Sequence, residues 1–155
     1  MIDVVKIASY LSQRYLKEFA EQIGEMKLHK LLYFTQRECI IQTGELLFED
    51  RFEAWRYGPV LVKIRYLFKE GLLTEKMSES ERKKYKSIFD MVFLTYAGKG
   101  AWSLSSVTHG EYSWQHAREG LSAEASCHQL IDNEDIRKDA ERVKLRRSMC
   151  ALLNK

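Results

Sequence analysis

The sequence predicts a mainly α-helical protein, a single bundle of about six helices with a short β element or extended segment around residues 46–57. Three observations support this fold class. Apolar residues recur every three or four positions over most of the chain, which is the period of an amphipathic helix. Glycines interrupt these stretches where helices would end. After residue 44 the period changes, and aromatic residues cluster ahead of Pro59, the only proline.

The size and composition fit one domain spanning residues 1–155, because single domains usually contain about 100–200 residues. Aromatic residues make up 12% of the sequence and provide apolar surface for a folded core. The three cysteines, Cys39, Cys127 and Cys150, form no C-x-x-C pair, which suits a reducing compartment. The N-terminus lacks a signal-peptide pattern, and no apolar run is long enough to span a bilayer. We therefore expect a cytoplasmic protein without a membrane segment.

Two amphipathic helices are predicted first. Residues 3–23 place apolar side chains three and four positions apart, with Asp3 as the N-cap and Gly24 at the end. Residues 25–43 carry apolar side chains on more than one face, so this helix should lie centrally in the core, and Gly44 should end it. A short turn would join the two helices into an antiparallel hairpin.

In the middle of the chain, after residue 44, the helical period of apolar residues is interrupted. Residues 46–57 should be extended, and Pro59 should fix the start of a helix that continues to Lys69, because proline suits the first helical position. Residues 74–84 are the most polar segment and should form a surface connection. Ser80 within it should cap the helix that follows.

Shorter helical pieces are predicted next. A helix should run from Tyr85 to Tyr96, where apolar residues keep the helical period, and glycines follow it. A second piece should cover residues 102–107. Residues 109–114 should form a loop, and residues 114–119 another helical turn.

The last helix, about 133–152, should open at the N-cap Asp132, be basic, and project from the bundle. From residue 137 to the end there are seven basic residues, including Lys155, against two acidic ones. These cations suit a solvated helix whose C-terminal end favours positive charge. The alternative is a basic arm for nucleic acid or an acidic partner. Its candidate contact residues are Arg142, Arg146 and Arg147.

The sequence contains no pattern that predicts catalysis. Loops of the kind that bind phosphate, and nucleophile motifs, are absent. The histidines and cysteine at His109, His116, Cys127 and His128 are the only set with metal-like clustering, and their spacing matches no zinc pattern. His29 lies among leucines and is interpreted as a partly buried, hydrogen-bonded histidine. We therefore expect a protein that is not an enzyme and that has no cofactor or metal.

The run around Trp55, Arg56 and Tyr57 is the most informative segment. Trp55 and Tyr57 lie two positions apart and would project to one side of an extended segment. Packing of both rings against the core is the favoured interpretation. The alternative is an exposed ridge that binds a partner, because Trp, Tyr and Arg dominate interface hot spots. Thr108 or His109 is expected to hydrogen-bond loop backbone.

Three blocks of sequence in a fixed order resemble a known family. The residues that carry the resemblance are Lys27, Leu31 and Tyr33, then Trp55, Tyr57, Gly58 and Pro59, and finally Thr108, His109 and Trp114. These blocks resemble the Panacea domain, also described as SocA-like or phage-associated GepA-like, over about residues 3–143. His29 stands where glutamine is common in the family, and Ser113 stands where proline is usual.

The resemblance implies a mostly helical antitoxin that neutralises a cognate protein toxin by direct binding in a bacterial or phage toxin–antitoxin pair. Its partner would then be a protein and not a metabolite. A close alternative is an adaptor that delivers the bound partner to a protease. A second alternative is a nucleic-acid-binding regulator that uses the basic C-terminal helix.

Overall fold

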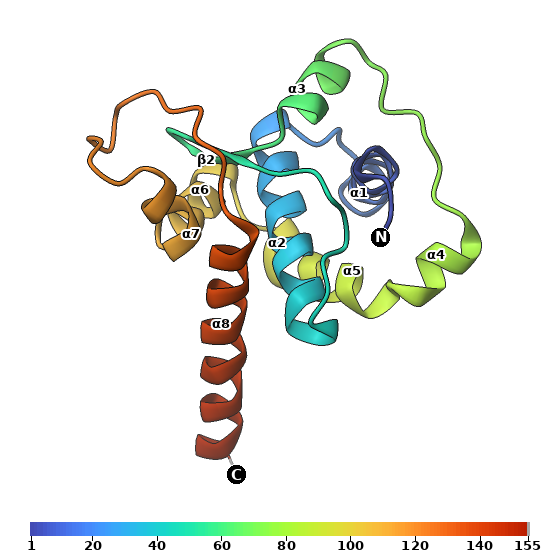
Figure 1. Ribbon diagram of the computed structural model, residues 1–155. Helices are drawn as coiled ribbons and strands as arrows, with labels where there is room; N and C mark the ends of the chain where they lie inside the picture. Colours follow the sequence, from blue (N-terminus) through green and yellow to red (C-terminus); the bar gives the residue numbers. More distant parts are fainter. Residues whose placement is uncertain (155) are drawn as a thin grey trace.

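Helix α2 (Glu25–Thr43) runs through the centre of the molecule, and most other elements pack around it (Figure 1). The computed structural model describes residues 1–154, and every residue from 28 to 40 is buried. The predicted central position of this helix is therefore confirmed. Gly44 ends α2 as predicted, because it adopts a left-handed conformation (φ 77°) in which its N–H donates to Ile40 O.

Helix α1 (Val4–Phe19) begins at the predicted N-cap, where Asp3 Oδ1 accepts a hydrogen bond from Val5 N at 2.9 Å. The prediction that α1 continues to residue 23 and is ended by Gly24 is wrong. Ala20 ends it earlier in a left-handed conformation (φ 57°), and its N–H donates to the carbonyl of Leu16. A non-glycine residue in this conformation is uncommon, so the early end of α1 could not be predicted from Ala20.

A two-stranded antiparallel sheet follows, formed by β1 (Glu53–Trp55) and β2 (Gly58–Val60), with a two-residue turn between them. The predicted helix start at Pro59 is wrong, because Pro59 pairs with Ala54 in the sheet and α3 (Val62–Lys69) begins later. Proline cannot donate to a ladder, but it is tolerated in an edge strand such as β2. Residues 129–131 lie along the other edge of β1.

The polar segment leads into α4 (Glu79–Lys84), which is followed by α5 (Lys86–Val92) and the single π-helical turn η1 (Phe93–Ala97). Ser78, and not Ser80, caps α4. Its hydroxyl accepts from Glu81 N at 3.1 Å, and the Glu81 carboxylate accepts from Ser78 N at 2.8 Å. This reciprocal pair is a capping box.

Helices α6 (Ala101–His109) and α7 (Tyr112–Ala117) occupy one side of α2. The prediction of a loop over residues 109–114 is wrong, because α6 continues to His109 and α7 begins at Tyr112. The Asp139 carboxylate, which belongs to the last helix, accepts hydrogen bonds from Tyr112 N at 2.8 Å and Ser113 N at 2.9 Å. The start of α7 is therefore capped from a distant part of the chain.

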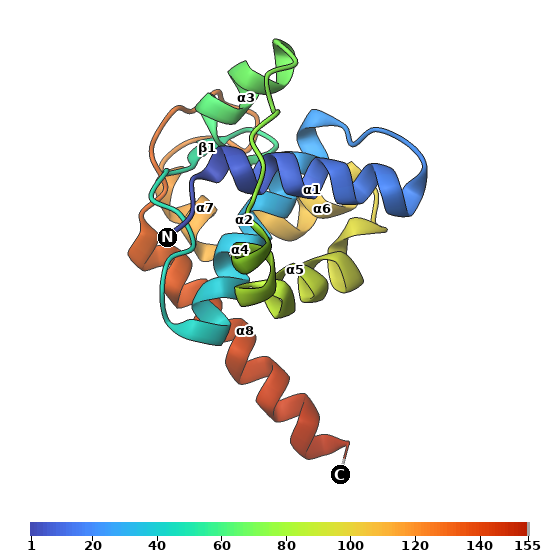
Figure 2. The same ribbon diagram turned by 90° about the vertical axis from the view of Figure 1, so that its right-hand side faces the viewer.

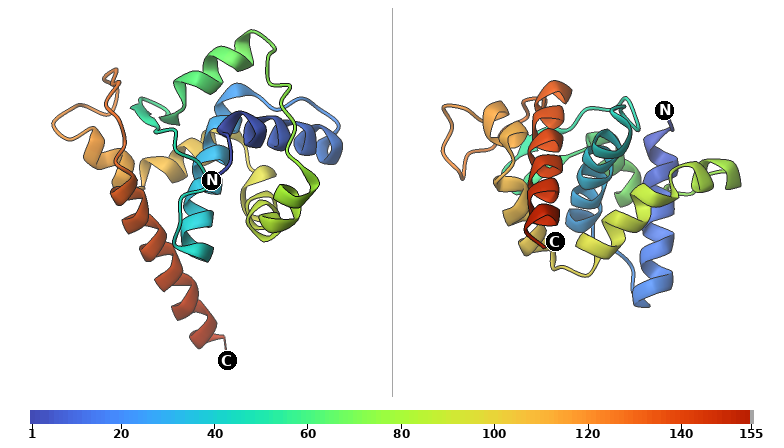
Figure 3. Two further views of the ribbon diagram at one scale, coloured as in Figure 1. Left: turned by 45° about the vertical axis from the view of Figure 1, so that its right-hand side comes forward. Right: turned by 90° about the horizontal axis from the view of Figure 1, so that it is seen from below.

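Helix α8 (Asn133–Leu153) opens at the predicted N-cap, Asp132, whose side chain accepts from Glu134 N at 2.8 Å. Its first half packs beside α2, as the view from below shows (Figure 3). Its second half leaves the body of the molecule (Figure 2). Val143 is the last buried residue of α8, so the ten residues 144–153 contribute nothing to the core. Lys155 lies outside the described residues.

The mainly α-helical class is confirmed. Within residues 1–154 there are eight α-helices instead of about six. Helix α4 lies in the polar segment predicted as a surface connection, and α7 begins inside the predicted loop and continues into the predicted helical turn over residues 114–119. None of the described helices is long and apolar enough to cross a membrane.

Candidate functional site

Segments of all three sequence blocks meet at the β1–β2 hairpin, the first of them through Lys30, which lies between Lys27 and Leu31. Five of its backbone carbonyls each accept a hydrogen bond from a side chain of another element. The pairs are Arg118 Nη1 with Ala54 O (2.9 Å), Trp114 Nε1 with Trp55 O (2.8 Å), His109 Nε2 with Arg56 O (3.0 Å), Ser105 Oγ with Tyr57 O (2.7 Å) and Lys30 Nζ with Pro59 O (3.2 Å). The blocks therefore fix the conformation of one hairpin, although they lie far apart in the sequence.

His109 and Thr108 have different roles in this arrangement. The predicted contact of His109 with loop backbone is confirmed, and its ring also stacks on Trp114 with 4.3 Å between centroids. Burial lowers the pKa of His109, which favours the neutral ring that stacks in this way. Thr108 instead donates to Ser105 O within its own helix.

Gly58 is required at the start of β2 for two independent reasons. Its φ of 116° is a conformation that residues with a side chain rarely adopt. A Cβ at this position would also lie 2.5 Å from both Lys30 Cε and Thr108 Oγ1. The hairpin can therefore rest on α2 and α6 only because residue 58 has no side chain.

Tyr33 belongs to a buried polar cluster that joins α2 to α7 and α8. Its hydroxyl lies 2.9 Å from Ser113 Oγ and 3.1 Å from carboxylate oxygens of both Glu111 and Asp139. Arg37 Nη1 donates to Glu111 Oε1 at 2.8 Å. Burial raises the pKa of the Tyr33 hydroxyl and of the Glu111 carboxyl, since both would be charged in an apolar interior.

The charged members of this cluster were not predicted from the sequence. Arg37 and Glu111 are separated by 74 positions, and Tyr33 and Asp139 by 106. No local spacing connects them, so no pattern in the sequence could have shown the cluster. The other two motif residues of α2 also stabilise the fold. Lys27 Nζ donates to Ala97 O at 3.1 Å, and Leu31 is fully buried.

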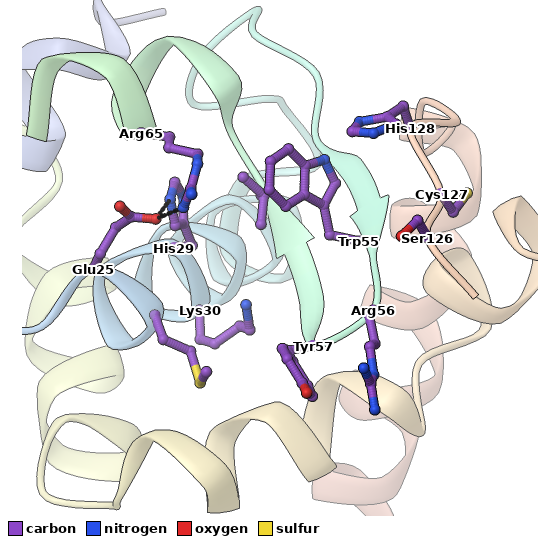
Figure 4. Close-up of a pocket in the computed structure, with 12 residues that line it drawn as sticks. Glu25, His29, Lys30, Trp55, Arg56, Tyr57, Arg65, Ser126, Cys127 and His128 are labelled. Atoms are coloured by element: carbon purple, nitrogen blue, oxygen red, sulfur yellow. Dashed lines mark hydrogen bonds and ion pairs between the residues drawn. The ribbon is translucent and has the colours of Figure 1, made fainter. Parts of the chain in front are cut away.

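A pocket of about 410 Å³ opens between α2, the hairpin, α3 and residues 126–128 (Figure 4). Lys30 lies on its wall, directed toward the hairpin, and is only 1% exposed. Burial lowers the pKa of the Lys30 ammonium to about 7. His29, next to it, accepts a hydrogen bond from Leu61 N at 3.3 Å, which confirms its interpretation as a buried, hydrogen-bonded histidine.

The rim of the pocket continues into an exposed aromatic face at the hairpin tip, formed by Arg56, Tyr57 and Trp102. Tyr57 is 40% exposed and meets Trp102, 64% exposed, edge to face with 5.2 Å between centroids. The Arg56 guanidinium lies 4.9 Å from the centre of the Tyr57 ring. Tyr57 therefore does not pack into the core as the favoured interpretation had it. Trp55, by contrast, is half-buried, with Arg65 over its ring at 5.2 Å.

The basic residues of α8 differ in their surroundings. Arg142 pairs with Glu111 at 3.1 Å, and Arg147 donates to both oxygens of the buried Glu38 at 3.0 Å. Arg146 is exposed and has no ion-pair partner within residues 1–154. Two of the three arginines predicted to contact a partner thus stabilise α8 against the body.

The four clustered histidine and cysteine residues, His109, His116, Cys127 and His128, make other contacts. His116 pairs with Asp135 at 2.6 Å, which raises the pKa of its ring, and His128 Nδ1 lies 3.3 Å from Glu53 Oε2. Over residues 1–154, no three His, Cys, Asp or Glu side chains are grouped so that they could hold a metal ion.

The sequence of this protein matches one known protein family. A sequence profile of the family described as antitoxin SocA-like, Panacea domain, matches residues 28–115. The chain belongs to this family. The matched region covers more than half of the chain and contains the hairpin and four of the five side chains that hold its carbonyls, whereas Arg118 lies just beyond it. No curated protein and no solved structure matches the chain significantly.

Membership in the SocA-like Panacea family supports a general antitoxin-like role and suggests a protein partner. The profile ends at residue 115, so α8 lies beyond the region that defines the family. The hairpin contacts are structural: they hold backbone carbonyls and leave the tip of the hairpin exposed.

Proposed function

We propose that this protein is the antitoxin of a bacterial or phage toxin–antitoxin pair and neutralises a cognate protein toxin by direct binding. The observation that carries this proposal is the match of residues 28–115 to the SocA-like Panacea family. The Tyr33 cluster is buried, and the side chains that hold the hairpin carbonyls are used internally, so the toxin would bind to exposed surface outside them.

The projecting half of α8 is the first surface that we propose for toxin binding. Leu145, Met149 and Leu152 follow each other at helical spacing and are 55–69% exposed. Exposed Lys144 and Arg146 lie on the same segment, and no acidic residue is found after residue 141. A second copy of this helix would be repelled by these charges, so the surface fits an amphipathic acidic segment of the toxin.

The aromatic face at the hairpin tip is the second proposed surface. Tyrosine, tryptophan and arginine contribute most to interface hot spots, and Arg56, Tyr57 and Trp102 provide all three. The rigid hairpin would hold these side chains in place before binding, which reduces the entropy lost in the complex.

The test is rescue of growth by co-expression. The gene next to this one should arrest growth when expressed alone and should be harmless together with the wild-type protein. A variant that combines Leu145→Glu, Met149→Glu and Leu152→Glu should fold, because glutamate favours helix, but should rescue at least about tenfold less efficiently. Leu94→Glu, which changes a residue 86% exposed on another element, is the matched control and should rescue fully. Failure of the wild-type protein to neutralise any neighbouring gene product would refute the proposal.

Two further measurements separate this function from its alternatives. A protease adaptor would shorten the half-life of the partner in a pulse-chase experiment, whereas neutralisation by binding leaves it unchanged or longer. A nucleic-acid-binding regulator would shift DNA or RNA at low salt and lose affinity steeply as salt increases. Arg142 and Arg147 pair with internal carboxylates, so few free cations remain on α8. This pairing weighs against a nucleic-acid-binding regulator.

A further inference from the structure

Lys30 is a buried cation without a buried anion. Its side chain is 1% exposed, and its ammonium makes one hydrogen bond, to Pro59 O at 3.2 Å. Within residues 1–154, no carboxylate oxygen lies within 4.0 Å of Nζ. An ammonium group has three protons to donate, so two remain without a protein acceptor. Buried lysines are rare unless they are paired, because the charge loses its hydration.

The pocket beside Lys30 has an excess of positive charge. Arg56 and Arg65 also line it, and Glu25 is the one carboxylate in its wall. That carboxylate is already engaged, since its Oε2 pairs with Arg65 and lies 3.4 Å from His29 Nε2. Neither Lys30 nor Arg56 has a carboxylate partner in the described structure.

Most of the remaining wall is apolar or aromatic, and Ser126 and His128 add polar groups on one side. Trp55 and Tyr57 contribute ring surface, and Met26 and Val60 contribute aliphatic surface. A volume of about 410 Å³ lies within the range of small-molecule sites, which combine mostly apolar walls with a few polar groups that fix orientation. The pocket therefore has the composition of a binding site for an amphiphilic ligand.

We propose that this pocket binds a small organic anion, with the carboxylate of the ligand against Lys30 Nζ and its planar or apolar part between Trp55 and Tyr57. The carboxylate would accept the two ammonium protons that the protein leaves unused. This proposal does not depend on the antitoxin function, because it rests on the pocket and its charges alone. Arg56 and Tyr57 also belong to the hairpin tip, so the ligand would sit directly beneath a proposed toxin contact.

Protonation of Lys30 should be coupled to binding. The titratable and charged groups that face the pocket are Glu25, His29, Lys30, Arg56, Tyr57, Arg65, Cys127 and His128. Binding of an anion favours the charged form of the nearest lysine, so it should raise the pKa of Lys30 from about 7. The affinity for the anion should accordingly be higher at pH 6 than at pH 9.

The experiment uses 3-phenylpropionate as the probe and 3-phenylpropanamide as its neutral isostere, with the full chain followed by NMR. The carboxylate should bind saturably, in the millimolar range expected for a ligand of this size. It should shift resonances of residues 55–57, and the amide should bind at least about tenfold more weakly. Lys30→Met, which keeps the side-chain volume, should weaken carboxylate binding by a similar factor. Lys27→Met is the matched control on the same helix and should bind like the wild type.

A measurement on the wild-type protein keeps the test independent of variant folding. The pH titration of the Lys30 Cε signal should move to higher pH when 3-phenylpropionate is added, which a purely structural lysine would not show. Absence of saturable binding, equal affinity for the amide, or an unchanged Lys30 titration would each overturn the proposal.

Discussion

Replacing Lys30 with methionine measures what the burial of this ammonium costs the fold. The folded-state pKa of Lys30 lies below its unfolded value, so between about pH 7 and 10.5 the unfolded chain binds more protons than the folded one. The free energy of unfolding must therefore rise with pH over this interval. Lowering the pKa from 10.5 to about 7 costs at most about 4 kcal/mol at pH 7, since one pKa unit corresponds to about 1.4 kcal/mol.

Lys30→Met removes this cost but also leaves Pro59 O without its donor, a loss of about 1–3 kcal/mol that does not depend on pH. We therefore expect the variant to be more stable than the wild type by about 1–3 kcal/mol at pH 7. The difference should shrink as pH rises and reverse between about pH 8 and pH 10, where the remaining cost of burial falls below that of the lost hydrogen bond.

Urea unfolding of both proteins at several values between pH 6 and pH 10 measures this difference directly. Lys27→Met serves as the control, because Lys27 has two acceptors and is only partly buried. A stability difference between Lys30→Met and wild type that stays constant across the pH range would refute the argument. It would mean that Lys30 is not desolvated in the folded protein.

Three further predictions concern the rest of the fold. Gly58→Ala should destabilise the protein by about 2–4 kcal/mol in thermal or urea unfolding, because φ of residue 58 is positive and the new Cβ would overlap Lys30. A loss of stability below ~0.5 kcal/mol would contradict this prediction. Glu111→Gln should cost about 3–5 kcal/mol, since it leaves the buried Arg37 guanidinium without its counter-charge, and an unchanged urea midpoint would disprove it. His116→Gln should lower the free energy of unfolding at pH 5.5 but not at pH 8. Asp135 raises the pKa of His116, so the stabilisation by the charged pair is lost as pH rises through that pKa. An equal effect of the substitution at both pH values would rule out the charged pair.

Elements that depend on local sequence could be predicted. The bounds of α2, its cap at Gly44 and the N-caps Asp3 and Asp132 follow from residues within one helical turn of each helix end. The cluster of leucines and aromatics in α2 also indicated its central position. These features are set by nearby side chains, so the sequence pattern contains the information.

Elements that depend on distant contacts could not be predicted. Pro59 belongs to a strand because β1 offers a partner and Lys30 reaches its carbonyl, and neither fact is visible beside the proline. Helix α7 begins where Asp139 caps it from another helix. Lys30 itself was not singled out, since a lysine between apolar residues of a helix usually points to solvent.

The interlocked hairpin gives the three separate sequence blocks a common structural role. Trp114, His109 and Lys30 each hold a different carbonyl of the same hairpin, and Gly58 lets the hairpin approach α2. Loss of one contact would leave a buried polar group without a partner, which is costly. The blocks therefore define a scaffold, while the hairpin tip and α8 remain free to differ in what they bind.

Direct binding between the purified protein and the product of the neighbouring toxin gene tests the central claim most directly. Isothermal titration calorimetry should show a saturable complex with the wild-type protein. The complex should be weakened at least about tenfold by the combined glutamate substitutions at Leu145, Met149 and Leu152, with the helix content unchanged. A toxin that is neutralised in cells but forms no complex with the purified protein would contradict the account.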